Sequence, residues 1–66
     1  SIIAVIPGST YVFIKDNVKV KLRGIIGTLF FKEDGSFLSS VFDNNIIDIV
    51  IPDEAYYVSF ATNGND

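Results

Sequence analysis

Short apolar runs separated by turn-forming residues follow one another along the chain, at a spacing of about 8–12 residues. Most runs are rich in β-branched and aromatic side chains, and no long segment repeats with a helical period, so the pattern predicts strands throughout. The expected strands span residues 2–6, 9–14, 18–23, 28–32, 37–42, 46–51 and 56–61. Six or seven short strands predict an all-β fold with no significant helix: a small antiparallel β-sandwich of jelly-roll type, or a small barrel.

Segment 18–23 has the strictest alternation of apolar and polar residues in the chain. Its apolar and basic side chains fall on opposite faces of an extended strand, which predicts a half-buried strand with a basic stripe. The stripe either contacts an anionic group of a ligand or partner, or is a solvated face that protects an edge strand. The apolar residues are Val18, Val20 and Leu22, and the basic residues are Lys19, Lys21 and Arg23.

Glycines predict where the strands turn and bend. Asp34-Gly35 lies between two apolar runs, and this dipeptide suits the two positive-φ positions of a type I′ hairpin turn. Gly24 and Gly27 bracket two isoleucines and predict a bend or bulge. The segment that follows, residues 28–32, is apolar on both faces and is expected to form a central strand.

Two adjacent tyrosines open the last expected strand, where neighbouring side chains point to opposite faces. Tyr56 shares a face with Val58 and Phe60, so the alternation predicts that Tyr56 is a core residue and that Tyr57 points outward. An outward tyrosine is an interface residue, a platform on which a sugar ring stacks, or an aromatic without a ligand.

Composition limits the size of the domain and the kinds of partner. The 66 residues make one domain, which we expect to be a module of a longer chain. The hydrophobic content of 48% and mean hydropathy of +0.40 are high for so small an interior, and no cysteine is present. We therefore expect other subunits, or the rest of a longer polypeptide, to cover apolar surface. The net charge of −3 is unfavourable for nucleic-acid binding, and no apolar run is long enough for membrane insertion as a helix.

The sequence offers little for catalysis or metal binding. Histidine and cysteine are absent, which removes the usual general base, thiol nucleophile and transition-metal ligands. The carboxylates fall mainly in turns, so we expect no enzyme activity, catalytic residue, cofactor or metal. Asp43, Asn45 and Asp48 could offer oxygen atoms to Ca²⁺, but their spacing does not match an EF-hand loop, so a solvated turn is the preferred interpretation.

Three blocks of the sequence resemble small β-sandwich modules of phage tail-fibre and baseplate proteins from Gram-positive hosts. The blocks are VIPGSTY, LFFKEDGSFLSS and IVIPDEAYYVSF, and the resemblance covers most of residues 5–60. If the core tyrosine of the family aligns with Tyr57, then Tyr57 rather than Tyr56 points inward. The matching residues are Pro7, Gly8 and Tyr11, then Phe30, Phe31, Gly35, Phe37, Leu38 and Ser39, then Pro52, Ala55, Tyr57 and Phe60.

The resemblance implies a jelly-roll or sandwich module of a receptor-binding or adhesion device, on a virion or an extracellular surface. Many such modules are trimeric and some bind carbohydrate, so a homo-oligomer, with a trimer as the expected form, and a cell-surface saccharide are the expected partners. The motifs specify the fold, and no binding residue is carried over from the family. If the chain binds a sugar, we expect Tyr57 to stack on it and Lys19, Lys21 or Arg23 to donate hydrogen bonds.

Two other functions compete with saccharide recognition. The first is a pure assembly module without a ligand, which the high apolar content favours. The second is a small SH3- or OB-like barrel that binds nucleic acid through the basic stripe, which the acidic balance of the chain opposes.

Overall fold

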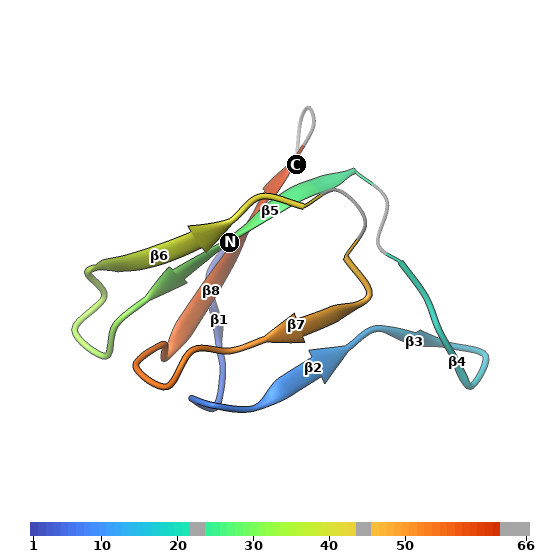
Figure 1. Cartoon of the computed structure of the whole chain (residues 1–66), viewed down its shortest axis with the longest axis horizontal. Coiled ribbons are helices and arrows are strands. Elements are labelled where there is room, and N and C mark those ends of the chain that lie inside the picture. The colour runs from blue at the N-terminus through green and yellow to red at the C-terminus, as the bar shows by residue number, and fades with distance from the viewer. Residues whose placement is uncertain (22–23, 44–45, 63–66) are drawn as a thin grey trace.

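The computed structural model describes residues 1–21, 24–43 and 46–62, and all their regular structure is β-strand. A four-stranded antiparallel sheet has the order β1-β8-β5-β6, strands β2 and β7 form a second layer, and β3 and β4 form a separate hairpin (Figure 1). The predicted all-β sandwich is confirmed, with eight strands in place of six or seven. The strands are β1 (Ile3–Ala4), β2 (Thr10–Val12), β3 (Ile14–Lys15), β4 (Val18–Lys19), β5 (Ile25–Phe31), β6 (Phe37–Val41), β7 (Asp48–Val50) and β8 (Tyr57–Thr62).

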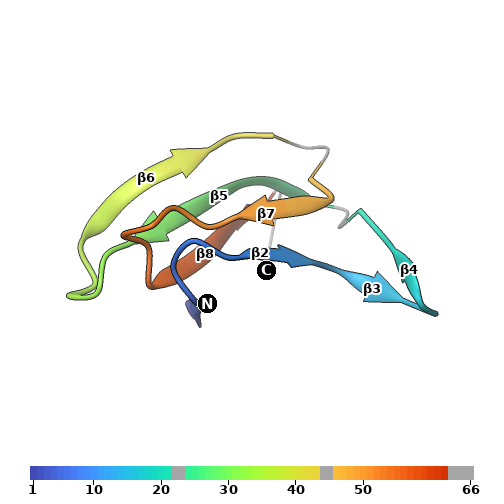
Figure 2. The same cartoon turned by 60° about the horizontal axis from the view of Figure 1, so that its bottom comes forward.

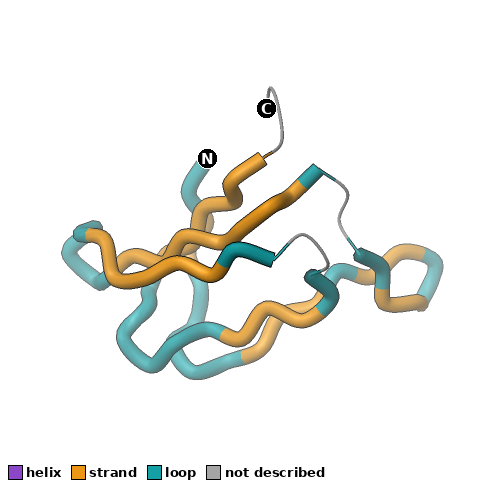
Figure 3. The backbone as a smooth tube through the Cα atoms, turned by 45° about the horizontal axis from the view of Figure 1, so that its top comes forward, coloured by secondary structure: helices purple, strands orange, loops and turns teal. Residues whose placement is uncertain are grey.

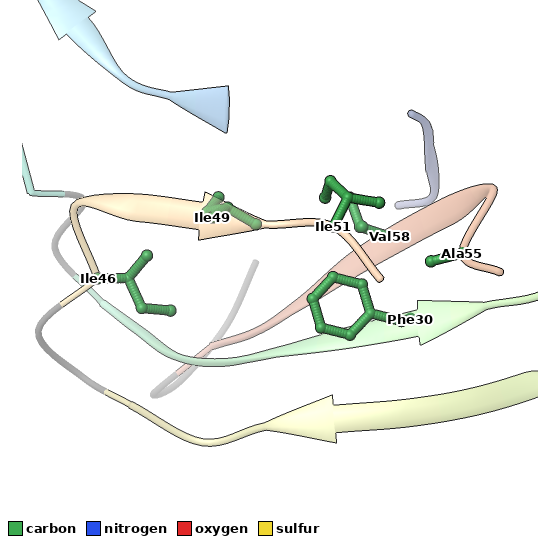
Figure 4. Packing of buried hydrophobic residues seen from close by; sticks show 6 residues of the cluster. All are labelled: Phe30, Ile46, Ile49, Ile51, Ala55 and Val58. Carbon is green, nitrogen blue, oxygen red and sulfur yellow. The ribbon is translucent and has the colours of Figure 1, made fainter. Parts of the chain in front are cut away.

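The hydrophobic core lies between the two layers (Figures 2 and 4). Phe30 of β5 and Val58 of β8 are directly opposite each other in the β5–β8 ladder, so both point to the same face. They meet Ile49 of β7 and Ile51, which follows that strand, and all four side chains are buried. Ala55 reaches the same core from the turn between β7 and β8 and is fully buried.

The structure places Tyr56 outside the core, contrary to the prediction from alternation. Strand β8 begins only at Tyr57, and Tyr56 is 38% exposed. Alternation of faces holds within an extended strand, whereas here the preceding turn brings Ala55 into the core. Tyr56 stabilises the sheet through its backbone: its N–H donates to the carbonyl of Phe31 at 2.8 Å, and its carbonyl accepts from the N–H of Val5 at 3.0 Å.

The type I′ turn lies at a different hairpin from the one predicted. Asp16 and Asn17 both have positive φ, 54° and 65°, and they connect β3 to β4 as a two-residue loop. Between β5 and β6 only Gly35 has a positive φ, 87°, and its N–H donates to the carbonyl of Lys32. That loop is therefore a turn over residues 33–34 followed by glycine. The β5–β6 hairpin was predicted correctly, but its type I′ geometry was wrong.

Strand β5 is the centre of the larger sheet, as predicted, and pairs with both β8 and β6. The predicted irregularity near Gly24 and Gly27 is confirmed, because the β5–β8 register shifts between Ile25 and Gly27. A Cβ atom at Gly27 would lie 2.6 Å from Cδ1 of Phe42, so the absence of a side chain leaves room for that ring.

Residues 14–21 form a hairpin arm that projects beyond the two layers, at the end of the molecule opposite the β5–β6 turn (Figures 1 and 3). The half-buried strand predicted here is wrong at Val18, which is 61% exposed because the arm extends past the layers that would cover it, whereas Val20 is half-buried. Strand β4 is also shorter than expected, and Leu22 and Arg23 lie outside the described residues.

Candidate functional site

The outer face of the four-stranded sheet, which points away from β2 and β7, carries the candidate site. Phe31 and Tyr57 point to this face because their strand neighbours Phe30 and Val58 point to the core. In the three longest strands, none of the residues that point to this face is charged. These residues are Gly27, Leu29, Phe31, Phe37, Ser40, Tyr57, Ser59 and Ala61.

Three rings lie side by side on the outer face and form what we call the aromatic row: Tyr57 of β8, Phe31 of β5 and Phe37 of β6. Phe31 is the register partner of both other residues, and the rings of Phe31 and Phe37 meet edge to face with centroids 6.2 Å apart. Phe37 is 56% exposed, whereas Phe31 and Tyr57 are half-buried. The row thus presents an aromatic surface to solvent, and Tyr57 lies on the outward face predicted from the sequence.

A shallow hollow of about 250 Å³ lies beside the aromatic row. The side chains of Tyr57, Phe31 and Ile2 line it, together with Glu33, Asp34 and Gly35 of the β5–β6 turn. The hollow therefore combines an apolar, aromatic surface with two carboxylates. A few polar groups on a largely apolar lining are the usual composition of a ligand-binding site.

Asp34 has a structural part in this hollow. Its Oδ1 atom accepts hydrogen bonds from the Ser36 hydroxyl at 2.6 Å and from the Ser36 N–H at 2.9 Å, a local turn typical of aspartate. The Ser36 hydroxyl, then the Ser36 N–H and the charge of Lys32, hold the pKa of Asp34 below its usual value of 3.8. Asp34 consequently remains ionised while it shapes the turn, and Glu33 brings a second carboxylate to the hollow.

The structure does not bring the predicted basic residues to Tyr57. Lys19 and Lys21 belong to the arm, at the end of the molecule opposite the hollow (Figure 1), and Arg23 lies outside the described residues. The Nζ atom of Lys19 lies 3.4 Å from Oδ1 of Asp48, and both side chains are more than half exposed, so this ion pair is worth little. Tyr57 and the two described lysines therefore belong to two separate surfaces.

Two of the three residues considered for calcium come close together. Asp43 and Asp48 line a second hollow of about 170 Å³, whereas Asn45 lies outside the described residues. Within the described part of the chain, no group of three or more His, Cys, Asp or Glu residues could hold a metal ion. The interpretation as a solvated turn stays a prediction.

A third hollow, of about 110 Å³, opens between the layers beside β1. Tyr11 supplies the only polar side chain of its lining among the described residues, and the Tyr11 hydroxyl already accepts a hydrogen bond from the Ile6 N–H at 3.0 Å. The other lining residues are the core and its margin. A lining with so few polar groups cannot orient a polar ligand, so this hollow is an open side of the core.

Comparison with known proteins adds no further assignment. No protein-family model matches the chain, and no match was found among curated proteins or solved structures. The resemblance to phage tail modules therefore stays a prediction. Among the described residues, no helix is long and apolar enough to cross a membrane.

Of the residues that form the aromatic row or line the hollow, the sequence predicted only Tyr57 as a site residue. Those not predicted as site residues are Ile2, Phe31, Glu33, Asp34, Gly35 and Phe37. Phe31 and Phe37 flank the Asp34-Gly35 turn, so the hairpin signal could have paired them. No local signal places Tyr57 beside Phe31, because that contact depends on the long-range pairing of β8 with β5.

Proposed function

We propose that this chain is a non-catalytic recognition module that binds saccharide in the hollow beside the aromatic row. The observation that carries the proposal is the register of β8 and β5, which sets Tyr57 against Phe31 next to the carboxylates of the β5–β6 turn. Carboxylates accept hydrogen bonds from hydroxyl groups, and flat rings pack on the apolar C–H face of a sugar. The two kinds of group in the hollow match the two kinds of surface on a pyranose.

Binding without chemistry is the simplest use of these groups. The chain has no histidine or cysteine, and the pKa of Asp34 is lowered, whereas a general acid at neutral pH needs a raised one. The hollow is shallow and open, which suits recognition of a glycan on a large surface. The resemblance to phage modules would place such a glycan on a host cell and the chain on a virion or another extracellular surface.

Nucleic acid is a less suitable ligand for the aromatic row, although bases also stack on exposed rings. The charged residues that line the hollow beside the row are Glu33 and Asp34, whose carboxylates repel a phosphate backbone. Lys19 and Lys21, the two described basic residues that the nucleic-acid alternative uses, are on the arm, at the other end of the molecule.

The proposal is tested by screening the chain against a glycan array and titrating any hit by NMR. Tyr57→Ala should weaken binding about fivefold or more, taking as a guide the stacking of a nucleic-acid base on one aromatic ring, which is worth about 1–3 kcal/mol. Tyr56→Ala is the matched control, because Tyr56 is an exposed tyrosine next in sequence that does not line the hollow. Absence of any saccharide binding, with Tyr57→Ala folding normally, would leave only a scaffold role.

A second candidate function is assembly, which the exposed large apolar side chains favour. They occur on every strand except β8 rather than in one patch. Those more than 60% exposed are Ile2, Ile6, Ile14, Val18, Phe42 and Val50. So many exposed apolar side chains on so small a chain are typical of a protein that meets another surface.

A further inference from the structure

The hairpin arm is the part of the molecule with the least support from the rest of the fold. Ile14 and Val18 are 64% and 61% exposed, and each stands opposite a lysine in the β3–β4 ladder. An isolated two-stranded hairpin is at best marginally stable in water, so an arm of this kind gains most from a partner. The exposed side chains of Ile14 and Val18 supply apolar contact area for such a partner.

The two ends of the molecule differ in charge. The arm carries three lysines, Lys15, Lys19 and Lys21, against one acid, Asp16. The opposite end is formed by the β5–β6 turn and the β7–β8 turn, which lie on the same side in both views (Figures 1 and 2). We call it the acidic end. It carries one lysine, Lys32, and four carboxylates: Glu33, Asp34, Asp53 and Glu54.

We infer that the arm of one copy docks on the acidic end of a second copy of this chain. The two surfaces are complementary in charge, and each also exposes large apolar side chains, Ile14 and Val18 on the arm and Ile2 and Phe37 near the acidic end. The chain is negative overall but concentrates its lysines on the arm, so the arm is complementary in charge to the acidic end of an identical chain. The occupant is therefore a second copy of the chain.

The position of the two surfaces limits the assemblies they can make. They lie at opposite ends of a molecule whose longest dimension is 34 Å, so an arm does not reach the acidic end of its own chain. Repeating the contact head to tail gives a ring or an open filament, whereas an antiparallel pair makes the contact twice in a dimer. The inference goes beyond saccharide recognition, because the arm has no part in the hollow, although the acidic end shares Glu33 and Asp34 with the hollow.

Sedimentation velocity at low and high salt tests the contact. Association should weaken as salt rises, because the attraction between exposed charges is screened. Lys15→Gln with Lys21→Gln should weaken it further, about two- to fivefold for each charge removed. Lys19 is left unchanged because it already pairs with Asp48. On the other surface, Glu54→Gln should act in the same direction without touching the arm.

Lys32→Gln is the matched control, since it removes the same charge from the acidic end. The docking contact predicts that this change strengthens association, whereas a simple effect of net charge predicts that it weakens association as Lys15→Gln does. A chain that is monomeric at every salt concentration would overturn the inference. Association that grows with salt, or Lys32→Gln acting like Lys15→Gln, would also overturn it. Saccharide binding by the Lys15→Gln variant, measured separately, keeps the two proposals distinguishable.

Discussion

The two faces of the four-stranded sheet contain similar residues in very different surroundings. On the inner face, Phe30 and Val58 are buried against the second layer. One residue away on the same strands, Phe31 and Tyr57 stand on the outer face with no described strand packed over them and remain half-buried. The comparison shows that residue type alone does not tell a core residue from a surface residue here. The side on which the second layer packs decides it.

The largest expected effect comes from truncating the two adjacent phenylalanines of β5. Phe30→Ala should cost about 3–5 kcal/mol, which is most of the stability of a chain this small, because it leaves a cavity between the layers. Phe31→Ala should cost about 1 kcal/mol, since its ring is half-buried and its ring contact with Phe37 is modest. Urea denaturation of both variants measures the difference. Equal losses would mean that another surface covers the outer face in solution.

A medium effect is expected at Gly27, a buried position on the outer face. Gly27→Ala should cost about 1–3 kcal/mol, because the new methyl group would collide with the ring of Phe42 and approach the carbonyl of Val41, 3.0 Å away. The control is the double variant with Phe42→Ala, which removes the ring and should recover part of the loss. Urea denaturation of the two single variants and the double variant gives a double-mutant cycle for the free energy of unfolding. If the losses of stability of the two single variants simply add, the ring of Phe42 is free to move aside.

The smallest effect concerns the turn that closes the outer face. The pKa of Asp34 is lower in the folded chain than its usual 3.8, so its contribution to stability is present above about pH 4 and is lost as the pH falls through the lowered pKa. Asp34→Ala should therefore be less stable than the parent at neutral pH, and the gap should narrow in acid. Denaturation at several pH values checks this. Ser36→Ala, which removes the principal hydrogen bond, should flatten the same profile.

Local sequence signals predicted much of the fold because they depend on neighbouring residues only. The apolar faces of residues 28–32 identified the central strand, the glycines marked the bulge before it, and Val58 and Phe60 marked the inward side of β8. The same alternation failed at Tyr56, because it was extended one residue past the start of the strand. Only one residue of the candidate site was predicted in this way: the outward position of Tyr57 was foreseen, whereas its neighbours Phe31 and Glu33 were not.

By itself, the sequence determined the all-β class, the approximate strands and the absence of histidine and cysteine chemistry, since these follow from composition and short-range pattern. The tertiary structure alone decided the type I′ turn at Asp16-Asn17, the exposure of Val18 and the aromatic row. It also separated Lys19 from Tyr57. Each of these depends on which strands pair and how far they extend, and strand pairing is set by contacts between residues that are distant in the sequence.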